Sequence, residues 1–213
     1  MNHRNGILVA AFLCLAPLLV VLGVAARPVL IEDPRAPILN SVEIGFAQDM
    51  LAHHSQALIM VARLDPGVDP TIRALAQRID AAQRGEIGEL TGWLRLSGAT
   101  TINPDPMAWM RHDAMADHQH GAAATETTGT GVMPGMATQV ELDALTAARG
   151  PAAGELFLRM MERHHYGGIQ MARAADALLE SGVVKQTARD MMSTEGQEAG
   201  VMGLMLTSLS ALR

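Results

Sequence analysis

The stretch FAQDMLAHHSQALIM at residues 46–60 returns later in the chain as FLRMMERHHYGGIQM at residues 157–171. Apolar residues coincide often in a chain that is 49% hydrophobic, but a His-His pair framed by two methionines at equal distances does not. The repeat therefore predicts two structurally equivalent halves. The matching positions are Phe46 and Phe157, Met50 and Met161, His53 and His164, His54 and His165, and Met60 and Met171.

The segments that follow each copy form a second repeat. Residues 76–93 align with residues 188–205, and both carry two polar residues, three positions apart, in an otherwise apolar stripe. Apolar residues recur every three or four positions in all four segments, which is the period of an amphipathic helix. The sequence therefore predicts an all-α fold, an antiparallel four-helix bundle built from two repeated helical hairpins. The polar pairs are Gln83 with Glu86 and Glu195 with Glu198.

Turn and cap signals set the predicted boundaries. Residues 27–40 hold three prolines and read as a linker, so the bundle domain is predicted over residues 41–213. Ser41, Thr71 and Thr138 are predicted to cap or begin helices. Repeat one covers 41–96, a Met/His-rich connection covers 97–137, and repeat two covers 138–213. The predicted helices run over about 41–64, 71–96, 106–118, 138–148, 153–180 and 183–212.

Residues 6–26 form an uncharged hydrophobic run that follows Arg4. The run is about long enough to cross a bilayer as a helix, and small residues at 23–26 suit a signal peptidase. For residues 1–26 a signal peptide and an uncleaved membrane anchor are both open, and only an anchor would contact the membrane. Because Arg4 precedes the run, we expect the remainder to be exported, to the periplasm or the extracellular face of the membrane.

Composition excludes several classes of function. The only cysteine, Cys14, lies in the hydrophobic run, so the exported part has no disulfide, thiolate zinc site or catalytic cysteine. The net charge is −6 and no stretch concentrates Lys and Arg, which argues against a nucleic-acid partner. No Ser-His-Asp signature, phosphate loop or nucleotide fingerprint occurs. Any metal must therefore be held by His, Met, carboxylate or amide groups.

The first histidine of each pair lies on the core-facing stripe of its helix, so His53 and His164 are predicted to point into the bundle. Antiparallel hairpins should bring each of them near the mid-helix polar pair of its own hairpin. His54 and His165 lie about 100° further round the helix. Because buried polar groups need partners, these groups either bind a metal ion or form a His–carboxylate layer that fixes the register of the bundle.

Methionines frame both histidine pairs at helical spacing. Their thioethers favour a soft metal ion, although methionine is also a common core filler. The candidate ligands of this inner layer are Met50, His53, His54, Met60, Met161, His164, His165 and Met171.

The connection between the repeats carries a second set of potential ligands in a polar segment. Thioether and imidazole donors together favour Cu(I), whereas imidazoles alone would also take Cu(II) or Zn(II). The alternative is a disordered linker that happens to contain these residues. The candidates are Met107, Met110, His112, Met115, His118, His120, Met133 and Met136.

Di-iron chemistry is a weaker alternative. Ferritin-like bundles hold two irons with a Glu on each of two helices and Glu-x-x-His on the other two. Glu162 and His165 have that spacing, but Leu51 stands at the position that matches Glu162, so the ligand set is one carboxylate short.

The motifs F-x-x-D-M-x-x-H-H-x-Q-A at 46–57, MPGMA at 133–137 and F-L-R-M-M-x-R-H-H-x-G at 157–167 resemble the family known as domain of unknown function 305. The resemblance covers roughly residues 41–210. It implies a ferritin-like four-helix bundle, and some members of that family are exported copper-binding proteins implicated in copper resistance. By motif position, the methionines and histidines of the inner layer are its characteristic residues.

Two departures from the family pattern concern the second copy. An acidic residue usually precedes the motif phenylalanine by about three positions. Glu43 takes that place in the first copy, but Gly154 stands there in the second, so the two histidine pairs need not be equivalent. His-Tyr-Gly-Gly at 165–168 also replaces the more usual Gln-Gly-Ala after the second pair.

These observations together predict an exported protein that binds copper through His and Met, with Cu(I) favoured and iron or zinc as the other metals. Its role would be buffering, sequestration or handover to a copper-handling protein, in copper homeostasis or resistance, rather than catalysis. The alternatives are a ferritin-like metal-dependent oxidoreductase and a metal-free structural or interaction bundle.

Overall fold

The computed structural model describes residues 37–111 and 133–211, and from Ile38 onward these residues belong to one compact unit. This part of the chain contains helices and connecting loops but no strand. The predicted export segment, the linker as far as residue 36, and residues 112–132 of the Met/His connection lie outside the described residues. The helices are α2 (Ser41–Arg63), α3 (Pro70–Leu96), η1 (Ala108–Arg111), α5 (Gln139–Ala147), α6 (Gly150–Leu178) and α7 (Val183–Ala211).

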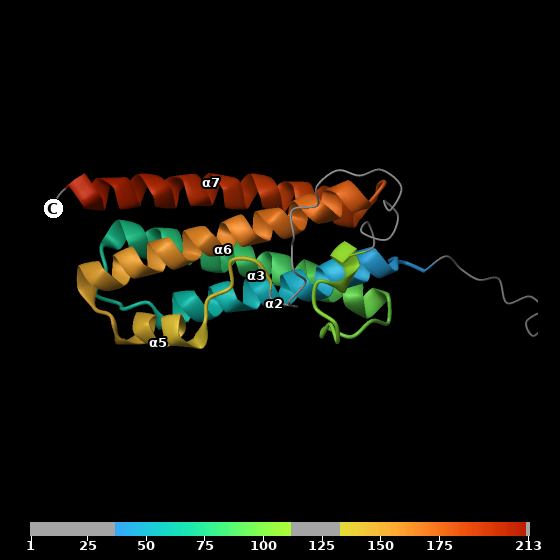
Figure 1. The fold of residues 1–213 in the computed structure, drawn as a ribbon, viewed down its shortest axis with the longest axis horizontal. Helices are drawn as coiled ribbons and strands as arrows, with labels where there is room; N and C mark the ends of the chain where they lie inside the picture. Colours follow the sequence, from blue (N-terminus) through green and yellow to red (C-terminus); the bar gives the residue numbers. More distant parts are fainter. Residues whose placement is uncertain (1–36, 112–132, 212–213) are drawn as a thin grey trace, which may run out of the picture. The chain divides into compact units, whose positions relative to one another are not determined.

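The four long helices form the two predicted hairpins. Helix α2 packs against α3 and α6 packs against α7, while α2 and α6 join the hairpins to each other. Figure 1 shows the hairpins side by side, with the short helix α5 at one end of the bundle. The predicted all-α bundle of two repeated hairpins is confirmed.

Helix caps explain most of the boundaries. Asn40, rather than the predicted Ser41, is the N-cap of α2 and forms a capping box with Glu43. Asp69, rather than Thr71, caps α3, and Pro70 follows in the first turn, where its missing N–H is not needed. Thr138 caps α5 as predicted. Of the short helix predicted over 106–118, the described part is the 3-10 turn η1.

The apolar core is divided into two clusters by a polar layer. Each cluster takes one end of α2 and the opposite end of α6, because these helices run antiparallel. The Phe46 cluster includes Phe46, Met50, Leu90, Met171 and Met191. The Phe157 cluster includes Met60, Ile79, Phe157, Met161 and Met202. The polar layer between them consists of His53, His54, Gln83, Glu86, His164, His165, Glu195 and Glu198.

Asp49 fastens the loop that follows α3 to the side of α2. Its buried carboxylate accepts hydrogen bonds from Asn103 Nδ2 at 2.9 Å, Met107 N at 2.7 Å and Trp109 Nε1 at 2.8 Å. Burial raises the pKa of Asp49, while the bonds from Met107, Trp109 and Asn103 act in the opposite direction. Gly45 makes room for the indole, since a Cβ there would lie 2.8 Å from a ring carbon of Trp109.

Replacing Asp49 with Asn should therefore loosen this loop. One side-chain oxygen becomes an amide that faces N–H donors, so we expect the free energy of unfolding to fall by about 2 kcal/mol. In a Trp93→Phe background, the emission of Trp109 should shift to longer wavelength as the ring meets water. Asp143→Asn, at an exposed position, is the control and should change stability by less than about 0.5 kcal/mol. Equal stability and emission in both variants would contradict this role for Asp49.

A paired Arg and Glu attach α5 to α6. Arg163 Nη1 and Nη2 donate to Glu141 Oε1 and Oε2 at 2.6 and 2.9 Å. The hydrogen bond from Arg163, followed by that from the Thr138 backbone, lowers the pKa of Glu141 to about 2. Because the folded-state pKa lies below the unfolded one, the pair stabilises the protein above about pH 4.5, and this contribution is lost as pH falls towards 2.

We expect Glu141→Gln to lower the free energy of unfolding by about 1 kcal/mol at pH 7, a figure reduced for the partial exposure of the pair. Gln can retain the capping box of α5, so the change isolates the charge. Denaturant unfolding from pH 7 to pH 2 should show the difference from the wild type falling to a small fraction of its value at pH 7. A difference that is undiminished at pH 2, or a double-mutant cycle with Arg163→Gln that shows no coupling, would refute the assignment.

Candidate metal centre

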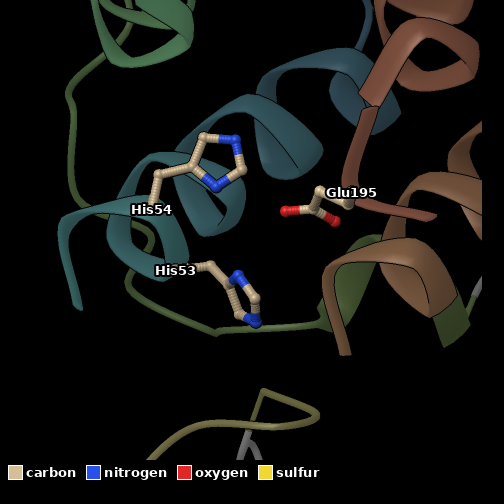
Figure 2. Close-up of side chains that lie close together, drawn as sticks. All are labelled: His53, His54 and Glu195. Atoms are coloured by element: carbon tan, nitrogen blue, oxygen red, sulfur yellow. The ribbon is translucent and has the colours of Figure 1, made fainter. Parts of the chain in front are cut away.

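The polar layer lies at the middle of the bundle, where all four long helices contribute a side chain. Its four histidines are completely buried, and Gln83 and Glu195 are each 1% exposed. Figure 2 shows His53 and His54 on α2, with the carboxylate of Glu195 projecting from α7 towards them. Buried polar groups require partners, so the contacts within this layer decide what the site can do.

The second histidine of each pair faces the acidic residue of its own hairpin. His54 Nε2 lies 2.7 Å from Glu86 Oε2, although its orientation is poor for a hydrogen bond. His165 Nε2 lies 2.8 Å from Glu198 Oε2 and donates to it. The sequence placed the first histidine of each pair near the polar pair of its own hairpin, but Glu86 and Glu198 contact the second histidine instead. The second histidines take these partners because residues 54 and 165 face the seam inside each hairpin.

The first histidines meet each other between the hairpins. The rings of His53 and His164 stack with centroids 3.8 Å apart and planes inclined by 30°. His53 Nε2 lies 3.0 Å from the carbonyl oxygen of Pro134, and His164 Nε2 lies 3.1 Å from that of His53. A carbonyl oxygen can only accept, so the proton of each ring is on Nε2 and the lone pair is on Nδ1.

His53, His164 and His165 each use Nε2 for a hydrogen bond to an acceptor of the protein, and Nε2 of His54 lies beside Glu86 without forming one. None of the four Nδ1 atoms has a hydrogen-bond partner in the described part of the chain, and each is buried. Oε2 of Glu195 and Oε1 of Gln83 are in the same condition. Metal-binding histidines show this arrangement, in which the non-coordinating N–H is held by a carboxylate or a carbonyl.

Burial favours the uncharged state of these groups. Desolvation, reinforced by the neighbouring His54, lowers the pKa of His53 to about 3. Desolvation and the neighbouring histidines also hold the pKa of His164 well below its usual value. The pKa of Glu195 is raised well above its usual value by desolvation and by the charge of Glu86. The two imidazoles are therefore neutral at pH 7 with free lone pairs, and a cation beside Glu195 would favour its ionised form.

Three of these side chains converge closely enough to share an ion. His53, His54 and Glu195 each offer a ligand atom, and the three atoms lie within 4.8 Å of one another. Gly168 makes this possible, because a Cβ at that position would overlap the Glu195 carboxylate. Imidazole and carboxylate donors suit Cu(II), Zn(II) and Fe(II). The residues present therefore fit a borderline divalent cation.

The predicted methionine ligands of the inner layer lie in the core on either side of it. Met50 and Met171 belong to the Phe46 cluster, and Met60 and Met161 belong to the Phe157 cluster. All four are completely buried. Their packing is that of ordinary core residues, and their role as metal ligands stays a prediction.

The second predicted set is only partly described. Met107, Met110 and Met133 pack against the Phe46 cluster, and Met136 is half-buried. His112, Met115, His118 and His120 lie outside the described residues. The proposed Met/His site in this connection therefore also stays a prediction.

The predicted metal ligands did not include Glu195 or Pro134. The sequence had placed Glu195 in the mid-helix polar pair of the second hairpin, as an acidic residue in an apolar stripe. Two glycines in the sequence, Gly135 and Gly167, could have indicated a close approach of the Pro134 loop to the histidines. Gly135 has a φ of +75°, and a side chain at Gly167 would overlap the Pro134 carbonyl, so both glycines allow the loop to reach the histidines.

Glu43 and Gly154, which stand at matching positions in the two copies, have different structural roles. Glu43 closes the capping box at Asn40. A Cβ at Gly154 would lie 2.8 Å from Cδ1 of Ile72.

Comparison with known proteins places this arrangement in a family. The sequence profile of a domain of unknown function, DUF305, matches residues 43–206. Among solved structures, a presumed secreted DUF305 protein from Streptomyces coelicolor is 31% identical, with a TM-score of 0.68 over 80% of this chain and 93% of that one. A DUF305 fragment from Deinococcus radiodurans is 27% identical, with a TM-score of 0.59 over 79% and 97%.

No curated protein matches the chain. The family profile spans most of the sequence and nearly all of the bundle, including both histidine pairs. This protein therefore belongs to the DUF305 family.

Proposed function

We propose that this protein binds copper outside the cytoplasm, as a buffer or carrier in copper homeostasis or resistance. The observation that carries the proposal is the state of the four buried histidines, whose Nε2 atoms face protein acceptors while their Nδ1 atoms have no partner among the described residues. The Glu195 carboxylate, brought beside His53 and His54, supplies a negative ligand.

A purely structural layer accounts for these contacts less well. Such a layer would leave every Nδ1 buried without a partner, at a cost of about 1–3 kcal/mol for each nitrogen. An apolar layer would avoid that cost, since the clusters above and below are well packed with methionine, leucine and phenylalanine. A bound ion accepts the lone pairs directly, so metal binding explains why the polar groups are there.

The choice of copper rests on the donors. Among divalent ions of the first transition series, Cu(II) binds a given nitrogen and oxygen site most strongly. The methionines and histidines predicted as ligands between residues 107 and 136 add thioethers, which favour Cu(I). Copper is the metal that both donor sets accept. The exported part also has no cysteine that copper could oxidise.

Export is part of the proposal. The hydrophobic run at residues 6–26 supports it, and so does the absence of cysteine from the proposed ligands, because thiols oxidise outside the cytoplasm. The presumed secretion of the Streptomyces coelicolor relative also supports it. Within residues 37–111 and 133–211, no helix is long and apolar enough to span a membrane.

The central test is metal competition by a variant that keeps the local hydrogen bond. In His53→Gln the amide can still donate to the Pro134 carbonyl, but the Nδ1 lone pair is lost. Titration of residues 27–213 with Cu(II), and anaerobically with Cu(I), against a coloured chelator should show affinity at least tenfold weaker than the wild type. Met50→Leu conserves core volume and asks whether a thioether contributes. Wild-type protein that fails to compete for either ion would refute the proposal.

Gly168→Ala tests the site without touching a ligand. The added methyl group overlaps the Glu195 carboxylate and should push it away from His53 and His54, so we expect copper affinity to fall about tenfold or more. Gly196→Ala is the matched control on α7, because a Cβ there meets nothing within 4 Å. The control should keep wild-type affinity and gain up to about 1 kcal/mol of stability. Equal affinity in the two variants would exclude Glu195 as a ligand.

A further inference from the structure

The two halves of the polar layer present almost the same imidazole frame. The rings of His53 and His54 have centroids 6.3 Å apart and planes at 58°, and those of His164 and His165 have centroids 6.4 Å apart and planes at 56°. In both halves the second histidine faces a carboxylate, at 2.7 Å in the first and 2.8 Å in the second. The histidines alone therefore predict two equivalent metal sites.

The halves differ in the third donor. Glu195 on α7 approaches the histidines of α2, and the repeat places Gln83 on α3 at the equivalent position for the histidines of α6. Gln83 Nε2 donates to Glu195 Oε1 at 3.5 Å, so the amide serves the carboxylate of the first half. Gly168, which admits Glu195, is replaced by Ala57 at the matching place on α2.

We propose that the polar layer holds a single metal ion in the half formed by His53, His54 and Glu195, and that the neutral Gln83 prevents the other half from holding a second. This inference rests on the proposed metal-binding function and adds the position and number of the ions. Gln83 is then a residue that determines stoichiometry.

The charge of the third donor explains why we expect one half to bind an ion and the other half not to. A divalent cation in a dry interior needs an anionic ligand, because bringing an unpaired charge out of water is costly. Glu195 can be that ligand, since no Lys or Arg in the described part of the chain pairs with it and its Oε2 has no partner. Glu86 and Glu198 instead lie against the Nε2 atoms of His54 and His165.

The second half offers two imidazoles and a neutral amide, whereas the first half offers two imidazoles and the Glu195 carboxylate. An amide oxygen is a weaker ligand than a carboxylate and leaves the charge of the ion uncompensated. A cation already bound beside Glu195 would also repel a second one across the stacked rings of His53 and His164. Both effects oppose filling of the second half, and a carboxylate at position 83 would offset both because it would compensate the charge of a second ion.

Native mass spectrometry of the chain loaded with Cu(II) alone tests the number of ions. We expect Gln83→Glu to bind one more ion than the wild type, and Glu195→Gln to bind one fewer. These differences are independent of any copper held elsewhere in the chain. An unchanged count in Gln83→Glu would overturn the inference, provided that the variant is folded by circular dichroism.

A matched pair of histidine variants locates the ion even if Gln83→Glu fails to fold. His54→Gln and His165→Gln remove equivalent side chains from the two halves. The first should lose one copper ion, and the second should keep the wild-type count. Loss of an ion from both would show that both halves take part in metal binding, which would overturn the inference while leaving metal binding intact. Wild-type protein that binds no copper would instead refute the proposed function itself.

Discussion

The requirement that four completely buried imidazoles find partners governs this bundle. Each Nε2 faces an acceptor on another segment: a carboxylate within the hairpin for His54 and His165, and a carbonyl of Pro134 or of α2 for the other two. These contacts join α2 to α3, α6 to α7 and α2 to α6, which are also the helix pairs that pack together. A slip of one helix by a turn would break several of them at once, so the layer determines the register of the bundle.

The layer also explains the way the core is built. It separates two apolar clusters, each made from one end of every long helix, and both are rich in methionine, whose flexible side chain fills irregular space. Glycines are placed where the polar groups come closest: Gly168 admits Glu195, and Gly135 and Gly167 admit the Pro134 loop. Gln56 completes this attachment by exchanging two hydrogen bonds with the backbone of Ala137. These glycines thus allow possible metal-binding groups to lie close together at the centre of a packed bundle.

The internal repeat gives the two halves of the bundle their similarity, and the positions at which the two copies differ make the halves unequal. Asp49 anchors the loop after α3, whereas the matching position on α6 is the apolar Met160. Gln56 holds Ala137, whereas its counterpart Gly167 makes room for the same loop. The loop after α3 and the loop at Pro134–Ala137 each occur only once in the chain. The residues that contact these loops therefore differ between the two copies of the repeat. Gln83 and Glu195 occupy matching positions of the repeat, and they are the two residues through which this difference affects the candidate metal centre.

The sequence by itself determined the helices, the two hairpins and the presence of a histidine and acid layer at mid-height. Each of these follows from periodicity and repetition, which can be recognised in the sequence without knowledge of the tertiary contacts. It did not determine which histidine of a pair faces the acids, because neighbouring residues differ by about 100° and the rotation of a helix depends on packing along its whole length. Only the tertiary structure brought Glu195 to the histidines of the opposite hairpin and the carbonyl of Pro134 to His53. Those contacts join residues 81 to 142 positions apart, and only assembly of the complete bundle decides which of them form.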